Sequence, residues 1–151
     1  MRGAAAALAA LILSGGTVAD AAPASCYRHA EAVADQAIRY TTEVMVMSDT
    51  CRNPTYERFA QRQRTELVRF QDLIKQHFRR QGGNPQSKLD TFLTHLANES
   101  ALRTGIKDIG QVCSVAVQFL ATADAMTNEA FRQYAESQVK EHGREYKFCK
   151  E

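Results

Sequence analysis

The side chains that could bind a metal ion or move a proton include four imidazoles, those of His29, His77, His95 and His142. No two of these histidines lie three or four positions apart, so no single helix presents two of them to one metal ion. The Glu-x-x-His signature of di-iron bundles and the Cys-x-x-Cys-His signature of covalent haem attachment are also absent. A metal or haem site therefore needs histidines from different helices, and His29 and His77 are the pair expected at one end of a bundle.

Four cysteines form the second group with chemistry of its own: Cys26, Cys51, Cys113 and Cys149. The two that are nearest in sequence are 25 positions apart, which does not fit the Cys-x-x-Cys spacing of zinc sites. An even number of cysteines in an exported chain predicts disulfides instead. We therefore predict two structural disulfides, each stabilising the fold by about 2–4 kcal/mol.

Helix geometry limits how the cysteines can pair. Cys26 and Cys51 flank a predicted helix that holds them ~37 Å apart, far beyond the reach of a disulfide. If the third predicted helix continues through Gly105, Cys113 lies level with Cys51 and Cys26 joins Cys149. If the chain reverses at Gly105, Cys149 lies level with Cys51 instead. We prefer the first pairing, Cys51–Cys113 with Cys26–Cys149.

The N-terminal segment indicates export. Arg2 precedes a short core rich in alanine and leucine, residues 4–13, and residues 19–21 have the small-x-small pattern of a cleavage site. We predict that residues 1–21 are a signal peptide that is removed, and that the protein is periplasmic or secreted. The apolar run is about half of the ~20 residues that span a bilayer, so no transmembrane anchor is expected.

The bulk composition is that of one ordinary globular domain. The chain has 151 residues and a formal net charge of +2, which gives no general attraction to nucleic acid, so no nucleic-acid partner is predicted. The Gly-x-Ser-x-Gly, phosphate-loop and His-Glu-x-x-His motifs are all absent from the sequence. We therefore predict no catalytic residue and no cofactor.

Hydrophobic residues recur at three- and four-residue steps, which predicts an all-α fold. We expect an antiparallel bundle of four or five helices, stapled by two disulfides, in a single domain of residues 25–149. Residues 54–80 predict one helix, a rod of roughly 40 Å that the other helices must line. Its apolar stripe consists of Tyr56, Phe59, Ala60, Leu67, Phe70, Leu73 and Ile74.

Three further stretches have hydrophobic residues at the same three- and four-residue spacing. The first helix is expected over residues 25–50, with an alanine-rich face that lets a neighbouring helix approach closely. The third begins at Pro85, and it either ends at Gly105 before a new helix or continues to about residue 123. The last begins near Thr127 and extends almost to the C-terminus.

The outer face of the helix predicted over residues 54–80 is rich in arginine, including Arg58, Arg62 and Arg69. One interpretation is a surface for an anionic partner, such as a lipid head group, a polyphosphate or an acidic protein. The other interpretation, which we favour, is a solvated face whose charges are partly compensated by acidic residues one turn away.

These features together predict a non-enzymatic protein of the cell envelope that works by binding, through a helix face or a groove between helices. The sequence does not identify the partner, for which we expect an envelope protein or an anionic surface. The alternative hypothesis is a metal- or haem-binding bundle that uses His29 and His77.

Overall fold

A computed structural model describes residues 26–105 and 108–150 of the chain. Within these residues the chain forms helices and no β-strand, so the predicted all-α bundle with two disulfides is confirmed. The predicted signal peptide, residues 1–21, lies outside them. The elements are α1 (His29–Thr50), α2 (Thr55–Arg62), α3 (Arg64–Arg80), α4 (Pro85–Gly105), α5 (Ile109–Ala125), α6 (Asn128–His142) and the 3-10 helix η1 (Gly143–Glu145).

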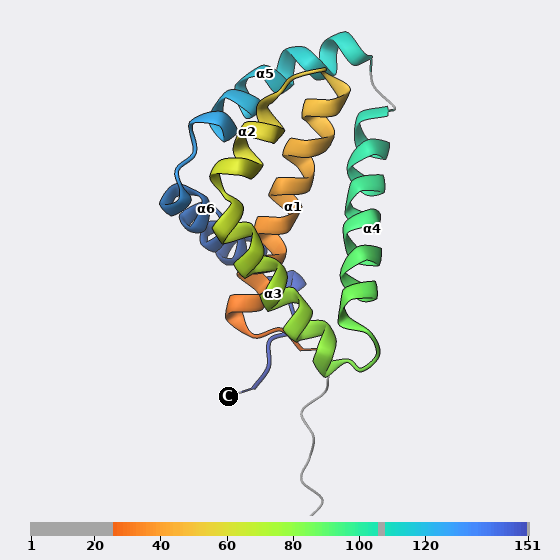
Figure 1. The fold of residues 1–151 in the computed structure, drawn as a ribbon, viewed down its shortest axis with the longest axis vertical. Coiled ribbons are helices and arrows are strands. Elements are labelled where there is room, and N and C mark those ends of the chain that lie inside the picture. Colours follow the sequence, from red (N-terminus) through yellow and green to blue (C-terminus); the bar gives the residue numbers. More distant parts are fainter. Residues whose placement is uncertain (1–25, 106–107, 151) are drawn as a thin grey trace, which may run out of the picture.

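Helix α1 runs through the centre of the bundle and packs against each of the helices α2 to α6 (Figure 1). This corrects the expectation that the other helices gather around residues 54–80. Every residue from Glu31 to Ile38 is buried, which leaves this part of α1 with no solvent-facing side. Ala32, Ala34 and Ala37 are fully buried, and their small side chains let other backbones approach α1 from several directions.

The helix predicted over residues 54–80 is divided at Gln63 into α2 and α3. The ψ angle of Gln63 is 7°, well away from the helical value of about −42°. Its side chain is fully buried, and its Nε2 donates a hydrogen bond to the carbonyl oxygen of Met126 at 2.8 Å. The bend thus accompanies a polar side chain that is anchored inside the core, which a pattern of hydrophobic residues does not reveal.

The observed ends of α4, α5 and α6 test the remaining predictions about where the helices begin and end. Helix α4 ends at Gly105, and α5 begins anew behind Asp108, whose carboxylate caps the first turn. Helix α6 begins behind Thr127 as predicted, and the threonine hydroxyl caps it. The prediction that this helix extends almost to the C-terminus is wrong, because it ends at His142 and the short helix η1 follows.

The two ends of the described chain lie side by side at one pole of the bundle. The N–H of Tyr27 donates to the carbonyl oxygen of Lys147 at 2.8 Å, and the N–H of Cys149 donates to that of Tyr27 at 3.0 Å. The Cys26–Cys149 disulfide closes the same place, with the Cα atoms 4.9 Å apart. Gly143 is a weak helix former, and this pairing satisfies backbone groups that a longer helix would otherwise have satisfied.

The second disulfide joins Cys51, just after α1, to Cys113 in α5, with the Cα atoms 5.5 Å apart. The two disulfides have the pairing that we preferred from the sequence. The premise for that preference is wrong, however, because α4 does not continue through Gly105. Helix α5 instead crosses the end of α1 (Figure 1). This crossing brings Cys113 to Cys51.

Aromatic side chains form the centre of the core. Phe131 of α6 contacts Phe59 and Phe70, with ring centroids 5.2 and 5.6 Å away. Tyr40 of α1 completes the group, with its ring 5.9 Å from that of Phe59. None of the three phenylalanine rings has exposed surface, so the placement of Phe59 and Phe70 on the buried stripe is confirmed.

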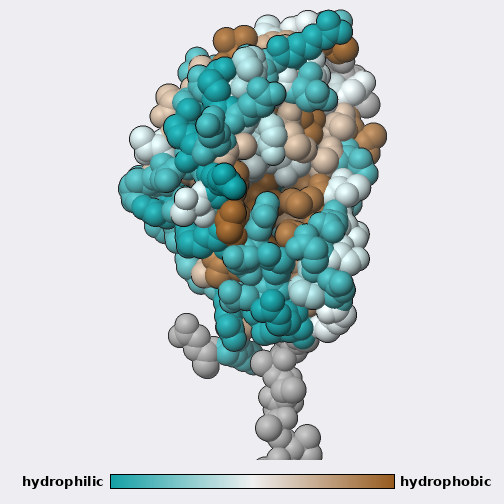
Figure 2. All heavy atoms as spheres, viewed as in Figure 1, coloured by the Kyte–Doolittle hydropathy of each residue, from teal (hydrophilic) through white to brown (hydrophobic). Residues whose placement is uncertain are grey.

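The face of the molecule that carries α2, α3 and α4 is hydrophilic over most of its area (Figure 2). Hydrophobic residues gather in a hollowed strip near its centre (Figure 2). A hollow of about 740 Å³, which we call the front hollow, opens between the end of α1, the start of α2 and α4. Met45, Tyr56 and Ala101 contribute to its lining.

Candidate functional site

The two histidines of the metal hypothesis lie in different surroundings. His29 is exposed at the start of α1, and its Nε2 lies 2.9 Å from Oε2 of Glu136. His77 is 1% exposed, with Nδ1 3.4 Å from the Arg80 guanidinium and Nε2 2.8 Å from the Gln81 amide. Across residues 26–105 and 108–150, no group of three or more His, Cys, Asp and Glu side chains is placed to hold a metal ion. The structure therefore shows no ligand set around either histidine.

His77 belongs to a buried polar cluster, which we call the terminal lock, formed by Tyr27, Glu31, His77 and Arg80. Arg80 donates from both terminal nitrogens to the Glu31 carboxylate, Nη2 at 2.6 Å from Oε2. Nδ1 of His77 lies 3.5 Å from the same carboxylate, and the imidazole stacks on the Tyr27 ring at 3.9 Å. Arg80 also donates to the carbonyl oxygen of Cys26 at 3.1 Å. The terminal lock thus ties α1 and α3 to the pole where the chain ends meet.

The pKa shifts of the residues in the terminal lock suit a structural role. Burial lowers the pKa of His77, and the nearby Glu31 carboxylate does not compensate, so the imidazole is neutral at pH 7. Burial alone would raise the pKa of Glu31, but hydrogen bonds from Arg80 and from the Arg28 N–H hold that pKa below its ordinary value. Burial also raises the pKa of Tyr27 to about 12. The two charged groups of the cluster, Glu31 and Arg80, thus form an ion pair with each other.

Asp35, one turn along α1 from Glu31, forms a second buried group. Its Oδ2 accepts hydrogen bonds from the Tyr146 hydroxyl and from Nε of Arg39, both at 2.6 Å. The Tyr146 oxygen in turn accepts a bond from Nε2 of Gln36 at 2.7 Å. Burial, followed by the charge of Asp35, raises the pKa of Tyr146, which keeps its hydroxyl protonated as a donor. Oδ1 of Asp35 has no hydrogen-bond partner among the described residues.

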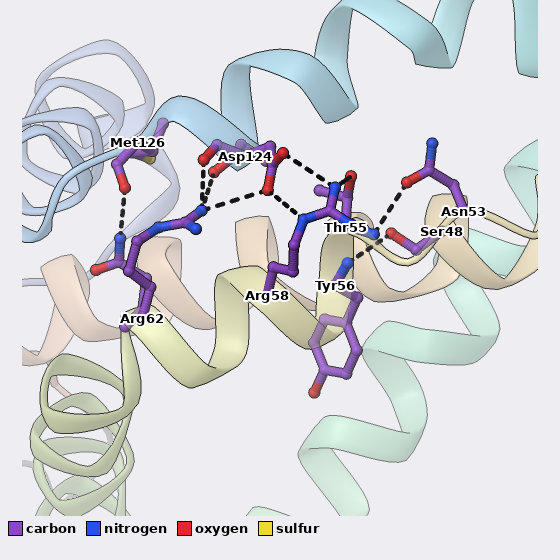
Figure 3. A network of polar contacts seen from close by, with 10 residues as sticks. Ser48, Asn53, Thr55, Tyr56, Arg58, Arg62, Asp124 and Met126 are labelled. Atoms are coloured by element: carbon purple, nitrogen blue, oxygen red, sulfur yellow. Dashed lines mark hydrogen bonds and ion pairs between the residues drawn. The ribbon is translucent and has the colours of Figure 1, made fainter.

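The arginines for which a face for an anionic partner was one interpretation, Arg58, Arg62 and Arg69, are bonded within the chain. Arg58 donates to both carboxylate oxygens of Asp124, at 2.9 and 3.0 Å (Figure 3). Arg62 donates to the main-chain carbonyl of Asp124 at 2.5 Å (Figure 3). The last carbonyls of a helix have no partner inside it, so Arg62 satisfies the end of α5. These two arginines therefore fasten α2 to α5.

Arg69, in contrast, contacts residues of its own helix, α3. Its Nη2 donates to Glu66 at 2.8 Å, and its guanidinium carbon lies 4.5 Å from the centre of the Phe70 ring. Glu66 is buried and also accepts a hydrogen bond from Arg132 at 3.0 Å. Arg58, Arg62 and Arg69 are thus each bonded to an acidic residue of the chain, and they do not form one free cationic row.

A long groove, which we call the α4 groove, lies between α4 on one side and α5 and α6 on the other, with α1 as its floor. It consists of two adjoining hollows, of about 330 and 600 Å³, which share Glu43, Ser100 and Arg103. The smaller hollow, between α1, α4 and α6, is lined mainly by polar side chains. The larger hollow, between α1, α4 and α5, has equal numbers of polar and apolar residues in its lining but presents mainly apolar surface. The groove therefore changes from polar to apolar along its length.

Tyr40 lines the smaller hollow of the α4 groove. It is 5% exposed, and its hydroxyl is buried with no hydrogen-bond partner in the described part of the chain. Its ring packs against Tyr134 and Phe119, with centroids 4.5 and 5.3 Å away. Burial, then Tyr134 and Glu43, raise the pKa of Tyr40 to about 12. Because buried polar groups are nearly always hydrogen-bonded, an unsatisfied hydroxyl in the groove wall is an unusual feature.

Helix α5 gives the groove its apolar wall. It carries no charged side chain from Ile109 to Ala123, and Val115 and Val117 are 77% and 66% exposed. Val115 lines the larger hollow, together with Phe119, whereas Val117 does not line it. Helix α5 thus presents apolar side chains both inside the α4 groove and outside it.

The sequence analysis missed the groove residues, Tyr40 and Glu43 among them. A groove of this kind depends on the separation between helices, which periodicity does not measure. The one available signal is in α4, where the inward stripe changes from Leu89 and Leu96 to Ser100 and Thr104. A buried stripe that becomes polar indicates that the neighbouring helices no longer close over it.

No protein-family model, curated protein or solved structure matches this chain. Among the described residues, no helix combines the length and the apolar character needed to cross a membrane. The function therefore has to be inferred from the geometry of this chain alone.

Proposed function

We propose that this protein works by binding, and that the α4 groove holds a small molecule with both a polar and an apolar part. The observation that carries the proposal is the buried Tyr40 hydroxyl without a partner in the groove wall. Small-molecule sites are concave and mostly apolar, with a few polar groups that orient the ligand. The apolar hollow lined by Met47 and Phe119, joined to the polar hollow at Tyr40, has this composition.

We also propose that the protein acts in the periplasm or outside the cell. All four cysteines lie in the described residues and are paired, which is the state that an oxidising compartment maintains. The predicted signal peptide supports the same location. An exported binding protein of this kind needs no catalytic residue and no cofactor, in agreement with the motifs that the sequence lacks.

Two valines of α5 provide a matched test of the binding site. Val115→Glu introduces a charge into the apolar hollow, whereas Val117→Glu introduces the same charge on the same helix outside it. Both positions are exposed, so both variants should fold with stabilities within about 0.5 kcal/mol of the wild type. We expect the neutral dye Nile red to gain fluorescence on binding the wild type, and Val115→Glu to weaken this binding about tenfold.

The control is Val117→Glu, which should bind Nile red as the wild type does. If the dye does not bind the wild type, or if the two variants weaken its binding equally, the α4 groove is not the binding site. Thermal denaturation of each variant verifies that a loss of dye binding does not come from unfolding.

A further inference from the structure

We infer that the ligand of the α4 groove is an organic cation, an alkylammonium amphiphile whose charged head lies against Glu43 and whose tail fills the larger hollow. This inference rests on the proposed function and names the ligand class of the same site. Glu43 belongs to both hollows, so a head group beside it has polar walls on one side and apolar walls on the other.

Glu43 is the one charged side chain of the groove wall without a bonded partner among the described residues, since Glu145 meets His142 at 3.2 Å. Arg39 is bonded to Asp35 at 2.6 Å, and Arg103 is bonded to Glu99 at 2.8 Å. Glu43 lies one turn after Arg39 and could meet it, but Arg39 is turned toward Asp35 instead. Within the described residues, the Glu43 carboxylate makes no hydrogen bond and no ion pair. The groove therefore offers a negative charge on a chain whose formal net charge is +2.

Aromatic rings line the same two hollows as Glu43. Tyr40 and Tyr134 line the smaller hollow and Phe119 lines the larger one, with Tyr40 in contact with both other rings. The faces of aromatic rings attract organic cations, and this attraction grows when water is excluded. The buried Tyr40 oxygen can also accept a hydrogen bond from an ammonium N–H. A carboxylate beside three aromatic rings is thus a suitable site for an ammonium head.

The larger hollow fits the apolar tail of such a ligand. Its lining away from Glu43 includes Met47, Val112, Ala116 and Phe119, none of which is charged. A flexible methionine side chain adapts its shape to chains of different length. Burial of an alkyl chain against these residues removes apolar surface of both partners from water.

An anionic ligand fits this groove less well. Its head would have to bind Arg39 or Arg103, and each of these already has a carboxylate partner. If an anion took Arg39 from Asp35, it would leave a carboxylate that is 1% exposed without that positive charge. A buried charge that loses its partner is strongly unfavourable.

The test compares three probes that share an octyl chain, namely octyltrimethylammonium, octyl glucoside and octyl sulfate, by titration calorimetry below their micelle concentrations. We expect octyltrimethylammonium to bind the wild type about tenfold more tightly than octyl sulfate. Glu43→Gln should remove this preference and leave the binding of neutral octyl glucoside unchanged. The matched control is Glu57→Gln, which neutralises an exposed carboxylate in the front hollow and should change nothing.

The outcomes separate the two claims. If none of the three probes binds the wild type, the proposed function itself is overturned. If octyl glucoside binds but octyl sulfate is preferred to octyltrimethylammonium, the groove binds amphiphiles and the inferred positive charge is wrong. The same holds if Glu43→Gln keeps the preference for the cation, or if Glu57→Gln abolishes it.

Discussion

The terminal lock and the α4 groove are built on the same helix, and they treat their carboxylates in opposite ways. Glu31 is buried near the start of α1 and is bonded by Arg80 from α3. Asp35 is buried one turn later and is bonded by Arg39 and Tyr146. Glu43 follows two turns further on, in the groove wall, and no side chain of the described residues is bonded to it. The fold thus gives a cationic partner to each of the two buried carboxylates and leaves the half-buried Glu43 free for the cation that we infer.

Breaking the terminal lock should have the largest effect on stability. Arg80→Ala leaves the Glu31 carboxylate, 1% exposed, without its cation. We expect the free energy of unfolding to fall by roughly 3 kcal/mol, the lower end of the range for buried pairs, because Arg80 is itself partly exposed. Urea denaturation measures this change. Arg79→Ala removes the exposed neighbouring arginine and should cost about 0.5 kcal/mol or less. Equal costs for both variants would show that the lock is not a source of stability.

Two tyrosine hydroxyls, one in the buried Asp35 group of α1 and one in the α4 groove, sharpen the comparison. Tyr146→Phe removes a hydroxyl bonded to Asp35 and Gln36, and should cost about 1–3 kcal/mol because it leaves buried polar groups unsatisfied. Tyr40→Phe removes a hydroxyl that has no partner, so stability should stay unchanged or rise by up to about 1 kcal/mol. The same Tyr40→Phe change should weaken the binding of octylammonium, whose N–H can donate to the Tyr40 oxygen, and should leave the binding of octyltrimethylammonium, which has no N–H, unchanged. A loss of stability in Tyr40→Phe as large as in Tyr146→Phe would contradict the distinction between the two regions.

Acidification should weaken the terminal lock gradually. The pKa of His77 is lowered by folding from its ordinary 6.5, so the unfolded chain binds a proton more readily than the folded one. The stability contributed by neutral His77 is therefore complete above pH 6.5 and is lost as the pH falls toward the folded pKa. The stability contributed by Glu31 is likewise lost as the pH falls below 4.5, because folding lowers the pKa of Glu31 as well. Thermal denaturation from about pH 7 to about pH 4 should show a falling melting temperature.

The variant His77→Gln isolates the contribution of His77 to this pH dependence. His77→Gln removes the titrating imidazole, so the fall just below pH 6.5 should be smaller than in the wild type. Glu43 does not belong to the lock, and Glu43→Gln should leave the profile over that range unchanged. A melting temperature that rises on mild acidification would mean that His77 becomes charged in the folded protein, which the geometry of the lock opposes.

The sequence was sufficient for the helical fold because periodicity and helix caps act over short distances. The apolar steps through Phe59, Phe70 and Phe131, and the cap at Thr127, can be read from neighbouring residues alone. It was insufficient where a polar residue occupies a buried position. At Gln63, where the predicted helix bends, the buried amide is bonded to Met126, a residue 63 positions away.

The terminal lock and the α4 groove could not be predicted from the sequence for a related reason. The terminal lock places Glu31 and His77 in the interior, and their burial is favourable only because Arg80 and Tyr27 reach them in the folded chain. The α4 groove depends on how far α4 stands from α5 and α6, a distance that no local pattern encodes. The spacing of the cysteines led to the preferred disulfide pairing, although Gly105 ends the helix on which that preference relied.

The two disulfides have a topological consequence for cleavage by proteases. Cys26 and Cys51 precede the exposed turn at Gly82 between α3 and α4, whereas their partners follow it. A single cut at that turn therefore releases no fragment and yields two polypeptides that are cross-linked twice. Such a nicked molecule should migrate as one species without reductant and as two species after reduction. A protein of this topology therefore survives a nick that would separate the halves of an uncross-linked bundle.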